Sequence, residues 1–232
     1  MDRAPQVPFP SPESWLPDQR PPTGTRAALH RLATAMRRNI HLLTETEADE
    51  AELIAAAEAL ERLNAQLAQR PRPHRLWGFA ETSNAGDPHA FFDYSPVVGQ
   101  ANPLAPPLQL RLEDGVVRGS GTFGNAYEGP PGHVHGGFIA AAFDEVLGLA
   151  QSTTGRPGMT GTLTVRYRHP TPLNRELRFE GRVERVEGRK IFTRGTLHAG
   201  DVLCAEAEAV FVSVDFERMV RLAAGQEPHR DA

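Results

Sequence analysis

Two neighbouring carboxylates, Asp144 and Glu145, lie in a stretch from Phe138 to Ala150. Nearly all of the remaining residues in this stretch are apolar or small. A helix that is apolar on all sides must be buried, so each carboxylate needs a partner, a cleft or a subunit boundary. Burial among apolar side chains raises the pKa of a carboxylate, which makes it a better general base while it stays ionised. The stretch therefore predicts one buried helix that carries a candidate acid–base group.

Glycine and proline residues mark the point at which this helix begins. The run Gly129-Pro130-Pro131-Gly132 stops any regular structure, and Gly136 and Gly137 leave the backbone N–H groups at the helix start unshielded. Free N–H groups and the helix dipole attract negative charge. The pattern thus combines an end that can polarise an electrophile with an acid two turns further along the same helix.

These features resemble the hotdog-fold thioesterases of the PaaI type, close to the Them-type acyl-CoA thioesterases. Besides the Gly-Pro-Pro-Gly approach, His135-Gly136-Gly137 is followed nine residues after the His by an acid, and residues 160–173 read TGTLTVRYRHPTPL. The resemblance covers about residues 88 to 214. It implies an α+β hotdog fold, an antiparallel sheet wrapped around one long buried helix. It also implies hydrolysis of an acyl-CoA thioester to CoA and a carboxylic acid, without metal or bound cofactor.

The resemblance also assigns catalytic roles to three residues. Asp144 aligns with the catalytic acid, which either orients and deprotonates a water or attacks the acyl carbon directly; both roles stay open. The backbone N–H of Gly136 meets the thioester oxygen and stabilises the oxyanion. Thr160, sixteen residues after Asp144, matches a Ser or Thr that helps to hold the water. Threonine also favours strands, so a structural role for Thr160 is the alternative.

Three further residues are candidate substrate-binding groups. His135 corresponds to the motif histidine and positions the substrate or the loop, while Gly137 is a second-ranked donor or a packing residue. Glu145 lies about 100° further round the helix than Asp144, so the two carboxylates do not face the same pocket. For Glu145 a salt bridge or dimer contact with an arginine such as Arg166 or Arg168 is better supported than catalysis.

Composition excludes several other classes of protein. A net charge of −4 over 232 residues argues against general nucleic-acid binding. The single cysteine, Cys204, rules out an internal disulfide and a cysteine-based metal site, and it reads as a small core residue. No apolar run is long enough to span a membrane, and the N-terminus does not resemble a secretory signal, so a cytoplasmic location is expected.

Runs of proline and glycine, together with the periodicity of apolar residues, divide the chain into five predicted parts. Within residues 108–214, alternating apolar residues predict strands. These include a hairpin from Leu108 to Phe123 with a turn at Glu113-Asp114-Gly115. The parts are a proline-rich arm (1–24), a helical extension (25–70), a loop-rich connection (71–107), the hotdog domain (108–214) and a C-terminal tail (215–232).

The helical extension is predicted to contain two helical stretches. Leu29, Leu32, Met36, Ile40 and Leu43 recur at helical spacing in the first stretch, and Leu53, Leu60 and Leu67 lie seven apart in the second. A capping box at residues 44–47 either starts a second helix or marks a bend in the first. The second helix is acidic on its other face, which argues against reading DNA. It is interpreted as a cover helix docked on the domain, with a partner-binding or dimer-extending helix as the alternative.

A single sheet of this size leaves its edge strands exposed. The resemblance implies the solution, a symmetric homodimer whose sheets pair edge to edge, with active sites between subunits; a dimer of dimers is also common in such families. Two other functions stay open on this fold. One is a non-catalytic acyl-CoA-binding domain. The other is a hydratase or dehydratase, although the acid–histidine motif of that class is not found.

Overall fold

A computed structural model of the chain describes residues 21–70, 88–156 and 158–213. The predicted C-terminal tail, most of the predicted arm and the first part of the loop-rich connection lie outside the described residues. No helix among the described residues is both long enough and apolar enough to cross a membrane.

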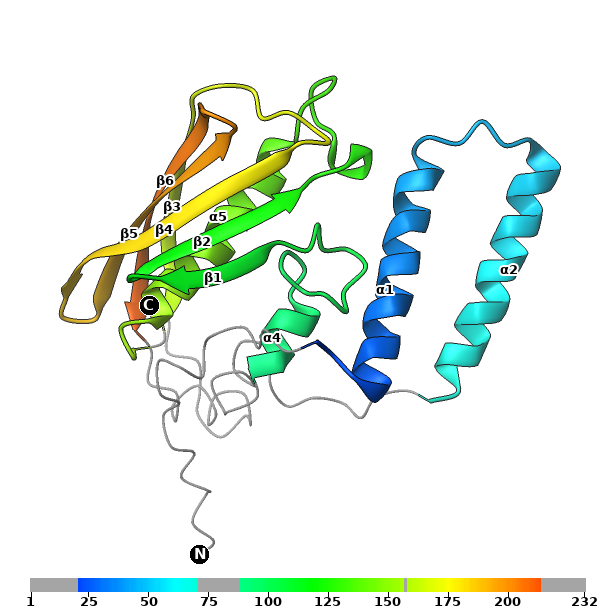
Figure 1. The fold of residues 1–232 in the computed structure, drawn as a ribbon, viewed down its shortest axis with the longest axis horizontal. Helices are drawn as coiled ribbons and strands as arrows, with labels where there is room; N and C mark the ends of the chain where they lie inside the picture. The colour runs from blue at the N-terminus through cyan, green and yellow to red at the C-terminus, as the bar shows by residue number, and fades with distance from the viewer. Residues whose placement is uncertain (1–20, 71–87, 157, 214–232) are drawn as a thin grey trace, which may run out of the picture.

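One antiparallel sheet forms the centre of the molecule (Figure 1). Its strand order is β1-β2-β4-β5-β6-β3, so β1 and β3 are the two edges. The predicted hairpin is confirmed, with β1 and β2 paired around a turn in which Asp114 and Gly115 have positive φ. The strands are β1 (Gln109–Glu113), β2 (Val116–Thr122), β3 (Gly158–Tyr167), β4 (Glu176–Glu187), β5 (Lys190–Ala199) and β6 (Val202–Ser213).

Helix α5 (Gly136–Ser152) packs on this sheet and supplies the core, as predicted for an α+β hotdog fold. Val146 and Leu147 are 0 % exposed. Two glycines paired across β4 and β5, Gly181 and Gly195, let the helix approach closely. A Cβ at Gly181 would lie 2.8 Å from Val146 Cγ1, and one at Gly195 would lie 3.1 Å from Leu147 Cδ2. The glycines therefore define how deeply α5 sits.

The burial of α5 differs from the expectation in one respect. Asp144 lies on a side of α5 where Ala140, Ala141 and Gly148 are also only half-buried. A helix covered on every side is thus wrong for the single chain, because one sheet covers only one side of a helix.

Helix α4 (Pro88–Tyr94) lies within the predicted loop-rich connection and precedes the sheet. Its Phe92 is buried in the core cluster, and the partly buried Phe91 packs against that cluster. Asp93 and Ser95 are buried polar residues, 4 % and 2 % exposed. Because buried polar groups need partners, both residues become anchor points for other elements.

Helix α1 (Gly24–Leu43) docks on the domain through polar side chains. Arg26 and His30 both contact the Asp93 carboxylate, with Nε–Oδ2 and Nε2–Oδ1 distances of 2.8 Å. The Arg37 guanidinium donates to the carbonyl oxygens of Ala105 at 2.7 Å and Asn102 at 2.9 Å. Asp93 has a lowered pKa because its bonds and charge interactions with Arg26 and His30 outweigh the opposing effect of burial. In the predicted apolar stripe of α1, Leu29, Leu32 and Met36 are half-buried and Ile40 and Leu43 are exposed, so polar contacts fix much of this docking.

Helix α2 (Glu50–Ala68) departs from the prediction in two ways. Its capping box is formed by Asp49 and Glu52, not by residues 44–47, since the chain loops through the latter. None of its residues is buried, and Leu60 and Leu67 are 43 % and 46 % exposed. Figure 1 shows α2 beyond α1, away from the sheet. The cover-helix interpretation is therefore wrong for α2 in the single chain, because α1 stands between it and the domain.

Candidate active site

The N-terminus of α5 presents one free backbone donor. His135 is the N-cap, and its Nδ1 accepts a hydrogen bond from the Gly137 amide at 3.0 Å. An accepting Nδ1 carries no proton, so this cap requires the neutral imidazole tautomer with its proton on Nε2. The Gly136 amide has no acceptor among the described residues. Of the two predicted donors, Gly136 is therefore the one available to a ligand, and Gly137 is occupied.

The loop that leads into α5 is held on both sides. The backbone amide of His135 donates to the carbonyl of Tyr127 at 2.9 Å, and that of Val134 donates to the carbonyl of Thr171 at 2.8 Å. Burial raises the pKa of Tyr127 to about 12, so its hydroxyl stays protonated and donates to the Leu104 carbonyl. These contacts fix the direction in which the chain enters the helix, and with it the direction of the free amide.

Asp144 and Thr160 contact each other directly. The Thr160 hydroxyl donates to Asp144 Oδ1 at 2.8 Å, from the edge strand β3 to α5. Leu163 and Val165 are the half-buried residues of β3, and a residue three positions before Leu163 would normally face the other way. The register of β3 shifts between Thr160 and Thr162, and such a bulge re-aims the side chains on one side of it. The irregularity accounts for a threonine facing the helix.

Glu145 contacts a different part of the molecule. Its Oε1 accepts a hydrogen bond from Ser95 Oγ at 2.6 Å, and Ser95 Oγ accepts from the amides of Val97 and Val98. Burial raises the pKa of Glu145 to about 7; the charge of Asp144 adds to the increase, and the Ser95 hydrogen bond opposes it. The two carboxylates thus face different partners, as their angular separation predicts.

The expected contact between Glu145 and an arginine is not formed. Arg166 pairs with Glu208 and Arg168 pairs with Glu206, both on the neighbouring strand β6. The antiparallel pairing of β3 with β6 places these side chains directly opposite each other, which satisfies the arginines within the sheet. The prediction of an arginine partner for Glu145 is therefore wrong within the chain.

The free amide and the Asp144 carboxylate are far apart in one chain. Gly136 and Asp144 are eight residues apart on one helix, which separates them by about 12 Å along the axis. A thioester carbonyl and its attacking water are within about 3 Å of their respective partners, so a single helix cannot serve one substrate with both groups. The contacts bring Asp144 and Thr160 together but leave Gly136 and His135 at a separate end.

Two residues at this site were not predicted. The Tyr167 hydroxyl donates to the Gly136 carbonyl at 2.8 Å and ties the helix start to β3. Ser95 holds Glu145, as described above. Tyr167 lies inside the segment that carries the family resemblance, but its alternation pattern only indicates a strand. Ser95 lies fifty residues before Glu145, and a lone serine in a loop gives no signal of such a contact.

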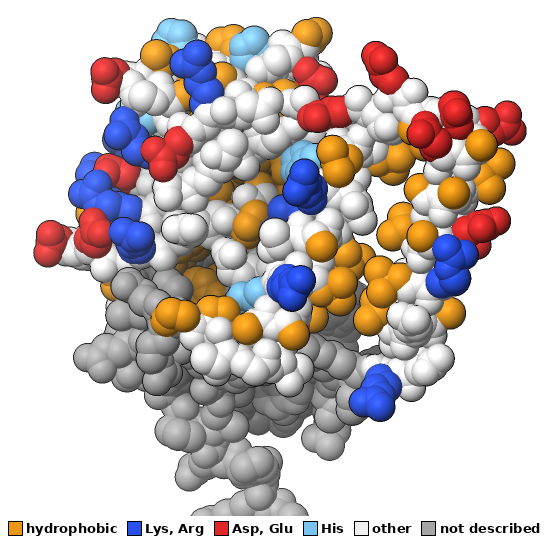
Figure 2. Space-filling view, turned by 45° about the vertical axis from the view of Figure 1, so that its right-hand side comes forward, with side chains coloured by type: hydrophobic (Ala, Val, Ile, Leu, Met, Phe, Trp, Pro, Cys, Tyr) orange, Lys and Arg blue, Asp and Glu red, His pale blue; other side chains and the backbone are white. Residues whose placement is uncertain are grey.

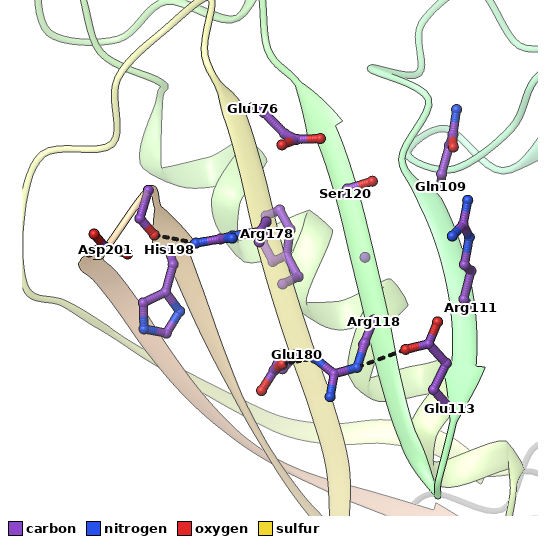
Figure 3. A pocket seen from close by; sticks show the side chains of 13 residues that line it. Gln109, Arg111, Glu113, Arg118, Ser120, Glu176, Arg178, Glu180, His198 and Asp201 are labelled. Carbon is purple, nitrogen blue, oxygen red and sulfur yellow. Dashed lines mark hydrogen bonds and ion pairs between the residues drawn. The ribbon is translucent and has the colours of Figure 1, made fainter.

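A separate hollow of about 710 Å³ lies on the outer face of the sheet, away from α5 (Figure 3). Arg111, Arg118 and Arg178 line it together with four acidic residues, and Arg118 pairs with Glu113 and Glu180. None of the candidate catalytic residues lines this hollow, and its charges largely balance each other. Among the described residues, no three His, Cys, Asp or Glu side chains gather as a metal site.

Comparisons with known proteins identify the family to which the chain is similar. The sequence profile described as Thioesterase superfamily matches residues 131–206, which include α5 and most of the strands that follow. The acyl-coenzyme A thioesterase THEM4 of Xenopus laevis is 39% identical over 89 residues, 38% of this chain and 40% of that protein. THEM4 of Mus musculus is 36% identical over 93 residues, 39% of this chain and 40% of that protein. The match thus spans about two fifths of the length of these curated relatives.

One solved structure resembles most of the chain. The crystal structure of a thioesterase superfamily protein is 37% identical, covers 83% of this chain and 97% of its own, and superposes with a TM-score of 0.73. This share is much larger than the part matched by the family profile, so the likeness extends beyond the segment around α5. On this evidence the chain belongs to the thioesterase superfamily.

Proposed function

We propose that the protein hydrolyses an acyl-CoA thioester to free CoA and a carboxylic acid. The observation that carries the proposal is the arrangement on α5, a free Gly136 amide at the helix start and an Asp144 carboxylate held by Thr160. The names of the THEM4 relatives support the substrate class. A thioester carbonyl is already electrophilic, so an oxyanion donor, a positioned carboxylate and a water suffice chemically.

Each group has a defined role in the proposed reaction. The thioester oxygen accepts the Gly136 N–H, which stabilises the negative charge that develops on that oxygen. Thr160 fixes Asp144 through Oδ1, and Oδ2, which has no partner among the described residues, takes a proton from water. The water oxygen then bonds to the acyl carbon. Collapse of the tetrahedral intermediate breaks the C–S bond, and the CoA thiolate takes up the proton held by Asp144.

The separation of the two groups requires two copies of the chain. The edge strand β3 pairs with β6 on one side only, and its Met159 and Tyr167 are 56 % and 54 % exposed. We place a two-fold axis at this edge, so that two α5 helices run antiparallel and Gly136 of one copy approaches Asp144 of the partner subunit. The half-buried side of α5 then receives its cover from the second copy.

Replacing Asp144 tests the chemistry. Asp144→Asn keeps the shape and the Thr160 contact but cannot take a proton, so kcat should fall at least about 100-fold, the scale expected for loss of a general base. KM should change little. Glu145→Gln is the control, because that carboxylate faces Ser95. Released thiol is measured over a panel of acyl-CoAs. A variant pair with the opposite result would assign catalysis to Glu145, and a wild-type protein that binds acyl-CoA without releasing thiol would be a binding domain.

A mixing experiment tests the shared site. Gly136→Pro removes the amide proton at a helix position where proline is well tolerated, and His135 already has the extended φ of −61° and ψ of 131° that precede proline. Gly136→Ala adds a Cβ against the Tyr167 hydroxyl but keeps the N–H, so it is the matched control.

Gly136→Pro and Asp144→Asn are each inactive by this proposal, but a mixed dimer contains one intact site. An equal mixture, after subunit exchange, should recover about a quarter of wild-type activity, as expected for random isologous dimers. If both variants are inactive alone and the mixture stays inactive although mixed dimers form, the two groups act within one chain and the dimer placement is wrong.

A further inference from the structure

The hairpin of α1 and α2 gathers most of the exposed hydrophobic side chains of the described residues. Seven of the twelve large ones that are exposed lie between Ile40 and Leu67. Figure 2 shows hydrophobic side chains along α2 and on the neighbouring part of α1. A patch of this kind on a soluble protein indicates an interaction surface.

The spacing on α2 is that of a helix that packs against other helices. Leu53, Leu60 and Leu67 are seven residues apart, and Leu63 lies between the last two on the same side. A stripe repeated every seven residues fits the holes of a facing helix. The ion pair between Glu58 and Arg62 lies on the opposite side of α2, about 160° from Leu60, so that side faces solvent. The stripe on α2 therefore needs helices as its cover.

The charges of the hairpin favour a second copy as that cover. Helix α1 carries four arginines and no acid, whereas α2 carries four glutamates and one arginine. Arg31 and Arg38 on α1 have no ion pair or hydrogen bond among the described residues. On α2, Glu52 and Glu61 flank the leucine stripe, about 80° and 100° from Leu60 on either side. One hairpin thus supplies both members of a complementary pair, which is what a two-fold interface requires.

We propose that the hairpins of two copies pack into a four-helix bundle. In this bundle the leucine stripe of each α2 is covered by the other copy, and each acidic α2 lies beside the basic α1 of that other copy. This surface is distinct from the β3 edge and from the Asp144 site, so it goes beyond the proposed catalytic function. It commits the helical extension to self-association rather than to covering its own domain.

A pair of matched variants on α2 tests the leucine stripe. Leu60→Glu places a charge in the centre of the stripe, and Ala55→Glu places the same charge about 140° away on the solvent side. Amide hydrogen exchange of α2 in the full chain is the readout, with circular dichroism as a check on helix content. Wild type and Ala55→Glu should show protected α2 amides, more so at higher protein concentration, whereas Leu60→Glu should exchange at least about tenfold faster.

Rapid exchange of α2 in the wild-type protein at all concentrations would overturn the proposal, since no second copy would then cover the stripe. Equal exchange in the two variants would overturn it as well. Either result is independent of the thioesterase assay.

A charge exchange tests whether the cover is a second copy. One variant carries Arg31→Glu and Arg38→Glu, and the other carries Glu52→Arg and Glu61→Arg. Each alone places like charges beside each other and should lose α2 protection, more strongly at low salt. In the mixture, a dimer of one copy of each variant has opposite charges at both contacts between α1 of one copy and α2 of the other. Protection of the α2 amides should therefore return. Variants that keep protection alone, or a mixture that fails to recover it, would rule out this packing of the two hairpins.

Discussion

Helices α5 and α2 carry apolar side chains at helical spacing, but the described chain covers only α5. Leu147 of α5 is 0 % exposed against the sheet, while Leu60 of α2 is 43 % exposed. Fully burying a leucine contributes about 1.5–3 kcal/mol relative to leaving it exposed. An apolar stripe on a helix therefore predicts that this face packs against something. It does not tell whether the packing surface belongs to the same chain or to another one.

Helix α1 is the intermediate case. Its leucine stripe is only partly buried, yet it is fixed to the domain through Arg26, His30 and Arg37. Asp93 and the carbonyls of the 100–105 loop are buried polar groups that need donors, and α1 supplies them. Polar satisfaction thus decides the position of α1, whereas apolar burial decides that of α5.

The largest difference should appear between two leucines. Leu147→Ala should lower the free energy of unfolding by about 2–5 kcal/mol, because it leaves a cavity under α5. Leu60→Ala should change it by less than about 0.5 kcal/mol in protein dilute enough to keep the hairpins apart. Urea unfolding followed by circular dichroism measures both. Similar losses in dilute protein would mean that α2 is covered within its own chain.

Two neighbouring arginines sharpen the contrast on α1. Arg37→Ala removes the donor of several backbone carbonyls and should cost about 1–3 kcal/mol of stability. Arg38→Ala, one residue further on the exposed side, should cost less than about 0.5 kcal/mol. Thermal unfolding of both variants gives the comparison. An Arg37→Ala loss as small as that of Arg38→Ala would show that apolar contacts hold α1 instead.

The smallest effect expected is a pH-dependent one at Glu145. Its folded pKa of about 7 lies above the ordinary value of 4.5, so the native state binds the proton more tightly than the unfolded state. Its favourable contribution is complete below pH 4.5 and is lost as the pH rises through about 7.

Glu145→Gln keeps an oxygen for the Ser95 hydrogen bond without the charge. It should stabilise the protein by about 1–2 kcal/mol near pH 8, and leave stability near pH 4 unchanged. Unfolding curves across this pH range measure the difference. A variant that is less stable near pH 8 would show that the ionised carboxylate has a favourable partner, such as a group from a second copy.

Periodicity predicted α5 and the hairpin of β1 and β2 to within a few residues, because alternation and apolar runs are local signals. Contacts between distant segments were beyond it. The docking of α1 through Arg37 and the contact of Ser95 with Glu145 depend on buried polar groups that only the folded chain brings together. The second helix is capped by Asp49 rather than by Thr44, because Asp49 and Glu52 form the capping box and residues 44–47 lie in the loop before it.

At the candidate site, the family resemblance brought out Asp144, Gly136 and Thr160, and the structure adds how they are arranged. The contact between Thr160 and Asp144 depends on a bulge, which alternation alone cannot reveal. The occupied amide of Gly137 follows from the His135 cap, a detail of one side-chain rotamer. Their catalytic roles remain proposals.

The glycine pair beneath α5 limits how this chain can change during evolution. Because Gly181 and Gly195 have no side chains, the depth of α5 is determined by backbone contact with Val146 and Leu147. A methyl group at Gly181 would lie 2.8 Å from Val146 Cγ1, closer than two carbon atoms pack, so Val146 or the helix that carries it would have to shift. Changes in the loops and on the outer face of the sheet leave this contact intact, whereas these two small positions constrain the packing of the helix that carries Asp144.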